Sequence, residues 1–117
     1  MSRTRGVALQ LAAARYLARW WPSAESAGSG RNGRDILGTP GVAFEIKTAR
    51  DFRPLSWVKQ AKRNAGTADV PVTVYVPNGV GERSAGAWLA IIPLDDLMGL
   101  LVEARYAPHP SLQELVD

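Results

Sequence analysis

The segment from residue 42 to residue 47 constrains the fold more than any other part of the chain, because its side chains alternate in character. The apolar positions are Val42, Phe44 and Ile46, and between them lie Ala43, Glu45 and Lys47. Successive residues of a β-strand point to opposite faces of a sheet. The alternation therefore predicts a strand with one apolar face, and with Glu45 and Lys47 projecting together from the other face. The preceding residues 38–41, Gly-Thr-Pro-Gly, are typical of a tight turn.

Helices and further strands are predicted on both sides of this strand. Apolar residues at helical spacing predict a helix over 5–21, and the early Pro54 and late Gly66 predict another between them. Extended segments are expected at 35–37, 72–76 and 87–92, a loop at 77–86, and a last helix from residue 94. With a first strand that is short, the order is helix, three strands, helix, two strands, helix. This order predicts an α/β fold with a central mixed β-sheet flanked by helices.

Each predicted helix has an apolar stripe. The stripes consist of Val7, Leu11, Ala14, Ala18 and Trp21 in the first helix, Trp57, Val58, Ala61 and Ala65 in the second, and Leu94, Leu97, Met98, Leu101 and Val102 in the last. Gln60 falls at the border of the second stripe. We expect Trp57 and Trp88 to belong to the core. Trp20 and Trp21 are adjacent, so they cannot both face inward equally.

The length and composition limit the possible classes of protein. A chain of 117 residues is enough for one domain, which we expect to span residues 1–106 with a tail at 107–117. No apolar run approaches the ~20 residues that span a bilayer, and the N-terminal residues are not typical of a secretory signal. The chain has no cysteine, which excludes disulfides, zinc–thiolate sites and thiol catalysis. Catalysis by a histidine base would depend on the single His109, between two prolines.

The charge is divided unevenly along the chain. Residues 1–64 carry twelve lysines and arginines against four acidic residues, whereas residues 65–117 carry two against seven. This asymmetry favours contact between the first half and a polyanion such as nucleic acid. A solvated surface that only keeps the protein in solution is the alternative interpretation.

Two carboxylates and one ammonium are predicted to share a patch. A short hairpin between Ile36 and Val42 would place Asp35 beside Glu45 and Lys47. Hard cations such as Mg²⁺ bind through one or two carboxylates while they keep several waters, and they can activate water for attack on a phosphodiester. A neighbouring lysine can position that water or stabilise developing negative charge. The alternative is an exposed ion pair across the sheet, which is the usual role of a Glu-x-Lys pair.

The arrangement of these residues resembles a known family. Asp35, then Glu45-Ile46-Lys47 after the turn, and then a helix that carries Gln60 resemble the PD-(D/E)XK nuclease superfamily. The resemblance covers roughly residues 5–103 and is closest to small Holliday-junction-resolvase-like proteins of archaea and bacteriophages. It implies a restriction-endonuclease-like core and Mg²⁺- or Mn²⁺-dependent cleavage of DNA, with branched duplexes as the expected substrate. It also implies a location in the cytoplasm of a bacterium or of a phage-infected host cell.

The resemblance assigns roles to individual residues. It implies that Asp35 and Glu45 ligate the metal together with the Ile46 carbonyl, that Lys47 is the catalytic lysine, and that Gln60 orients the site. Two positions depart from the family pattern. Gln10 stands where the first helix often carries an acidic metal ligand, which predicts a weaker or single ion, and Arg34 replaces the proline before the motif aspartate.

Basic residues on both sides of the motif are candidate contacts to DNA phosphates. They are Arg31, Arg34, Arg50, Arg53, Lys59, Lys62 and Arg63. A homodimer is expected, because a four-way junction needs two symmetric cuts and one domain offers one site. Its interface could use Trp20 and Trp21, the last helix or the tail. Two other functions remain open: a nucleic-acid-binding module that has lost efficient catalysis through Gln10, and a structural or regulatory phage protein that uses the fold as a scaffold.

Overall fold

The computed structural model describes residues 3–28, 33–48 and 51–110 and has the predicted order of helices and strands. The elements are α1 (Arg3–Leu17), β1 (Glu25–Ser26), β2 (Ile36–Leu37), β3 (Val42–Lys47), α2 (Pro54–Ala65), β4 (Val70–Tyr75), the short 3₁₀ helix η1 (Glu82–Ala87), β5 (Leu89–Ile91) and α3 (Leu94–Glu103). η1 occupies part of the segment that is predicted as a loop. No helix within the described ranges is long and apolar enough to cross a membrane.

The central sheet is mixed, as predicted. β3 pairs with β4 in parallel, β4 pairs with β5 in antiparallel orientation, and β1 and β2 form a separate antiparallel ribbon. Parallel strands need a crossover connection, and α2 lies in the one between β3 and β4. The register sets Glu45 opposite Thr73 and Lys47 opposite Tyr75.

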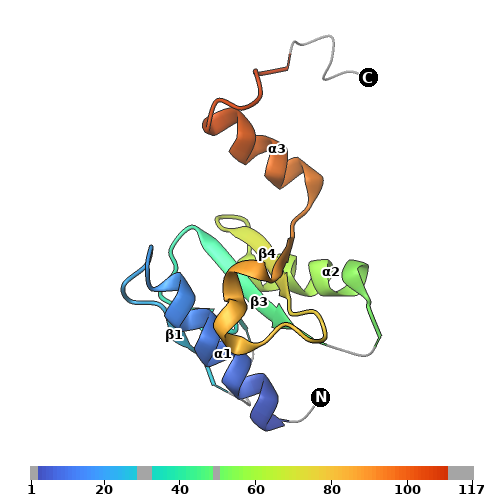
Figure 1. Ribbon diagram of the computed structural model, residues 1–117. Helices are drawn as coiled ribbons and strands as arrows, with labels where there is room; N and C mark the ends of the chain where they lie inside the picture. The colour runs from blue at the N-terminus through green and yellow to red at the C-terminus, as the bar shows by residue number, and fades with distance from the viewer. Residues whose placement is uncertain (1–2, 29–32, 49–50, 111–117) are drawn as a thin grey trace.

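The two faces of β3 meet different helices (Figure 1). Phe44 packs in a buried cluster with Ala13 and Ala14 of α1, and Val42 and Ile46 pack against the same cluster. On the opposite face, Glu45 and Lys47 contact side chains of α2. The strict alternation of β3 thus produces an apolar layer beneath α1 and a polar layer beneath α2.

The predicted buried stripe of α1 is confirmed at Ala14 and wrong at Leu11. Leu11 is 44% exposed, whereas Leu9 is buried together with Ala12, Ala13 and Ala14. The helix also ends at Leu17, so Trp21 lies beyond it and packs edge-on against Phe44. Three consecutive alanines fit a close helix–sheet contact at several rotations, and for that reason they do not mark the buried face in the sequence.

Of the remaining tryptophans, the two that are predicted to belong to the core pack there. Trp57 is buried in α2, and Trp88 packs against the core cluster while its indole N–H donates to the Gly81 carbonyl. Trp20 is exposed.

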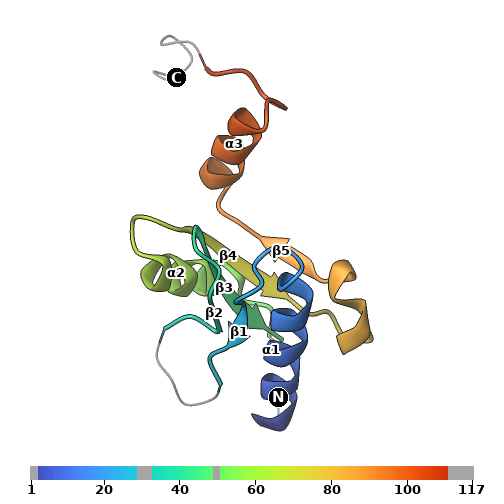
Figure 2. The ribbon, with the colours of Figure 1, turned by 90° about the vertical axis from the view of Figure 1, so that its left-hand side faces the viewer.

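α3 has the predicted apolar face, but it stands away from the rest of the molecule (Figures 1 and 2). None of its residues is buried, and Leu94, Leu97, Met98 and Leu100 are all exposed. Residues 107–110 after it form no helix or strand, and residues 111–117 lie outside the described part. The apolar side of this helix is therefore open.

The turn between β2 and β3 is fixed from both sides. Within the turn, the Val42 amide donates to the Thr39 carbonyl at 3.1 Å, and the Thr39 hydroxyl donates to the Val42 carbonyl at 2.9 Å. Gly38, the first residue of the turn, has φ +80°. It also lies so close to the Ser23 carbonyl, which is outside the turn, that a Cβ atom would overlap this carbonyl. Glycine is required here both by the backbone conformation and by this close approach.

Gly38→Ala should lower the free energy of unfolding by about 3 kcal/mol, because the left-handed backbone and the overlap with Ser23 both cost free energy. Gly41→Ala is the matched control, since Gly41 has φ +95° but open space around its Cβ position. It should cost only about 1 kcal/mol. Urea denaturation of the two variants measures the difference, and equal losses would show that the contact with Ser23 is not tight.

Candidate functional site

Asp35 is tied to β3 by two hydrogen bonds, although the predicted hairpin is wrong in its pairing, because β2 pairs with β1 and not with β3. The Ile46 amide donates to the Asp35 carboxylate at 2.7 Å, and the Asp35 amide donates to the Phe44 carbonyl at 3.3 Å. The N–H and C=O of one strand residue point to the same side, so the Ile46 carbonyl faces this side as well. The carboxylate is thereby held at the edge of β3, next to the side chain of Glu45.

Glu45 is a buried acid. Its side chain is 1% exposed, and it accepts a short hydrogen bond from the Asn64 side chain of α2. Burial raises the pKa of the Glu45 carboxyl to about 7, and the charge of Asp35 and a hydrogen bond with it act in the same direction. The Asn64 hydrogen bond and the charge of Lys47 lower the pKa but do not offset these effects. The Glu45 carboxyl is therefore partly protonated near neutral pH.

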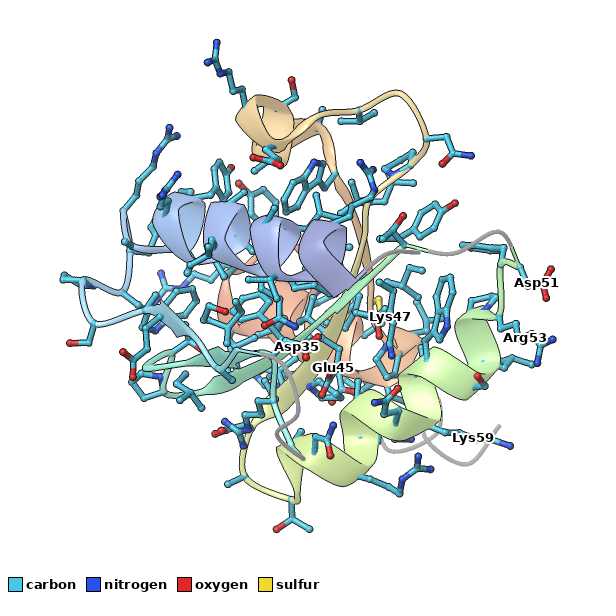
Figure 3. All side chains as sticks on the ribbon, turned by 90° about the horizontal axis from the view of Figure 1, so that it is seen from below. Asp35, Glu45, Lys47, Asp51, Arg53 and Lys59 are labelled. Atoms are coloured by element: carbon cyan, nitrogen blue, oxygen red, sulfur yellow. The ribbon has the colours of Figure 1, made fainter. Side chains whose placement is uncertain are left out.

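Lys47 is oriented by Gln60. Its ammonium donates to the Gln60 side-chain oxygen at 2.7 Å. Figure 3 shows Asp35, Glu45 and Lys47 gathered together beside α2, whereas Arg53 and Lys59 lie farther out along that helix. The structure thus brings together the four residues that the sequence singles out as catalytic.

Sequence reasoning missed Asn64, which also contacts the site. Its amide donates both to Glu45 and to the Gly33 carbonyl, so it joins the acid to the loop before Asp35. Asn64 follows Gln60 by four residues, and residues at this spacing share one face of a helix. This four-residue spacing is the sequence feature from which the role of Asn64 could have been predicted.

Thr73 is a second residue that sequence reasoning missed. It is fully buried at the position of β4 that pairs with Glu45. Among the described residues, its hydroxyl is the one buried side-chain oxygen or nitrogen without a hydrogen-bond partner. In the sequence it is one threonine in a strand of apolar residues, and only the register connects it to the site.

Gln10 lies near the site but is already engaged. Its side-chain oxygen accepts a hydrogen bond from the Ser26 hydroxyl at 3.1 Å, which links α1 to β1. The neutral side chain thus adds no negative charge here. Within the described ranges, no group of three or more His, Cys, Asp or Glu side chains could hold a metal ion. The candidate cation donors are consequently the two carboxylates and neutral oxygen atoms beside them.

The predicted phosphate contacts differ in whether their side chains already bind other residues. Arg34 forms an ion pair with Asp69 and donates to the carbonyls of Asn64 and Ala65, so it ties the loop to the end of α2. Arg53 is exposed and forms an ion pair with Asp51. Lys59, Lys62 and Arg63 are exposed on α2. Arg31 and Arg50 lie outside the described residues.

Comparison with known proteins finds no matching family model, no matching curated protein and no matching solved structure.

The raised pKa of Glu45 predicts a pH-dependent stability of the metal-free protein. The ordinary value of 4.5 applies to the unfolded chain and about 7 to the folded one, so the folded state binds more protons between these values. The contribution of Glu45 to the free energy of unfolding is full below pH 4.5 and is lost as the pH rises through 7, by up to about 3 kcal/mol.

Urea denaturation between pH 5 and pH 8.5, in the presence of a chelator, checks this expectation. Glu45→Gln keeps an acceptor for Asn64 but cannot ionise, so its stability should fall less with pH than that of the wild type. Parallel profiles for the two proteins would show that Glu45 is already ionised at pH 5.

Proposed function

We propose that this chain is a metal-dependent endonuclease that hydrolyses phosphodiester bonds in DNA, on a restriction-endonuclease-like core. The observation that carries the proposal is the convergence of the Asp35 and Glu45 carboxyls beside Lys47, whose ammonium is held by Gln60 at 2.7 Å. An exposed ion pair across a sheet would not need a fully covered carboxyl or a helix side chain that orients the lysine. Buried charged and polar groups in this arrangement are typical of sites that perform chemistry.

The donor set fits a hard divalent cation such as Mg²⁺ or Mn²⁺. Asp35 and Glu45 offer carboxylate oxygens, and the Ile46 carbonyl faces the same side. The charge of Asp35 raises the pKa of Glu45, and a bound cation would offset the repulsion between the two carboxylates. Because Gln10 supplies no charge, we expect one ion held weakly until DNA phosphate adds further oxygens.

The residues of the site have separate roles in the proposed hydrolysis. Asp35 and Glu45 would hold the cation, which would supply polarisation of the scissile phosphate and a lower pKa of its water. The Lys47 ammonium, held in place by Gln60, positions the attacking water and stabilises negative charge that develops on the phosphate. Asn64 holds Glu45 in a fixed orientation through its amide. Lys59, Lys62, Arg63 and Arg53 supply exposed positive charge along α2 for the DNA backbone.

Branched DNA is the proposed substrate, cut by a symmetric homodimer. The proposed partner for the exposed face of α3 is a second copy, because an identical apolar face would match it. In an antiparallel pair about a two-fold axis, the two apolar faces would cover each other. Arg105 would then lie near Asp95 and Asp96 of the other copy, and Glu103 at the end of the same helix would offset part of that attraction.

The decisive experiment measures metal binding and cleavage separately. The wild type should bind Mn²⁺ in calorimetry and cut a four-way junction with Mg²⁺ or Mn²⁺ present, whereas Asp35→Ala should bind no Mn²⁺. Lys47→Ala should lower the cleavage rate at least about 100-fold and leave DNA binding nearly intact, with a change in salt slope of at most about 1.

Lys59→Ala is the matched control for Lys47, because it removes an exposed lysine that lies outside the site (Figure 3). It should cut at nearly the wild-type rate when DNA is saturating. Equal Mn²⁺ binding by the wild type and Asp35→Ala would place the metal elsewhere. DNA binding without cleavage of linear, flapped or four-way DNA would indicate a binding module on the same fold.

The dimer is tested on α3. Met98→Glu should convert a dimer into a monomer in light scattering, because it places a charge in the apolar face, and it should not lower the melting temperature of the monomeric body. Gly99→Glu is the control, since the next residue points away from that face and has open space around its Cβ position. A wild-type protein that is monomeric at all concentrations would contradict this assembly and leave the nuclease proposal in place.

A further inference from the structure

Thr73 lies between two valines of β4, but its side chain is on the other face of the strand. The residues Val70, Val72 and Val74 have their side chains on the face toward α1, and Val72 and Val74 pack against its core cluster. Thr73 lies on the opposite face, is 0% exposed, and has a hydroxyl without a hydrogen-bond partner. Valine has nearly the same shape as threonine and would fill this position without a polar atom.

A buried hydroxyl without a partner destabilises the folded state, because it loses its hydrogen bonds to water. The other buried threonine shows the usual outcome, since the Thr39 hydroxyl donates to the Val42 carbonyl at 2.9 Å. Buried groups without partners in native proteins are few, and a catalytic role or an absent ligand is a common reason for them. The Thr73 hydroxyl therefore indicates a partner that is present only when the site is occupied.

The position of Thr73 identifies the site concerned. In the parallel register, Thr73 is the direct partner of Glu45, so the two side chains lie next to each other on the face that α2 covers. Asn64 occupies one oxygen of the Glu45 carboxyl from the side of α2. Thr73 approaches the same side chain from the neighbouring strand.

We infer that Thr73 is a positioning residue of the metal site, and that its hydroxyl donates to the Glu45 carboxylate when that carboxylate holds a divalent cation. This inference rests on the proposed function and adds a residue to its site. Hydrogen bonds to a ligating carboxylate fix its orientation, and their loss typically lowers metal affinity 10- to 100-fold. Thr73 and Asn64 would then hold Glu45 from both sides.

Calorimetry with Mn²⁺ and thermal melting, with and without Mn²⁺, test the inference on the full chain. Thr73→Val should bind Mn²⁺ at least 10-fold more weakly than the wild type, yet melt at the same or a higher temperature without metal. Thr73→Ser keeps the hydroxyl and should bind Mn²⁺ within about 3-fold of the wild type. Thr39→Val is the control for a buried hydroxyl that has a partner, and it should lower the melting temperature without metal.

Three other outcomes would contradict either the role of Thr73 or the proposed metal site. Wild-type Mn²⁺ affinity in Thr73→Val would overturn the role of Thr73 while the proposed metal site stands. A lower melting temperature of Thr73→Val without metal would show that the hydroxyl serves the fold, which also overturns the inference. A wild-type protein that binds no Mn²⁺ would instead remove the proposed function, and the inference with it.

Discussion

The hydrogen bond from the Ile46 amide to the Asp35 carboxylate joins the two parts of the polypeptide from which the candidate site is built. It anchors Asp35, at the start of β2, to the edge of β3, and it sets one carboxylate beside the buried Glu45. Burial raises the pKa of the Glu45 carboxyl, and the nearby charge of Asp35 raises it further. The polar layer on this face of the sheet, including Lys47 and its partner Gln60, is arranged around that pair.

A small domain can hold such a polar layer only if most of its groups have partners. Asn64, Gln60 and the Ile46 amide each satisfy one charged side chain of the site. The opposite face of the sheet is apolar and packs on the alanines of α1, which allow a close approach. The α2 side combines the polar site with the buried apolar residues Trp57, Ala61 and Ala65. A cation that binds two repelling carboxylates would add stability to the same face.

α3 differs from the other two α-helices in that none of its residues is buried. Its ten residues have good helical periodicity and acidic residues in the first turn. Helices of this length are marginal in water without packing, so the apolar face needs a partner. A second copy in antiparallel orientation would cover this face. This assembly would carry two sites in a fixed symmetric relation, which is what paired cuts in a branched duplex require.

Much of the fold and of the candidate site could be predicted from the sequence, because local periodicity decides which side chains share a face. The alternation in β3 places Glu45 with Lys47, Pro54 and Gly66 bound α2, and the Gly-Thr-Pro-Gly turn brings Asp35 back to β3. Other features depend on how the elements dock. Arg34 is paired with Asp69, far along the chain, and the run of alanines in α1 hides the fact that Leu9 and not Leu11 is buried.

Spacing within short segments specifies the helices and strands, their order and the polar face of β3. Three other features follow from packing: Asn64 holds Glu45, Thr73 lies beside Glu45 without a partner, and α3 leaves its apolar face open. Each of them depends on the register between β3 and β4 or on the packing of a helix. The spacing within α2 places Asn64 on the face of Gln60, but contact with Glu45 requires segments that are distant in the chain to pack together.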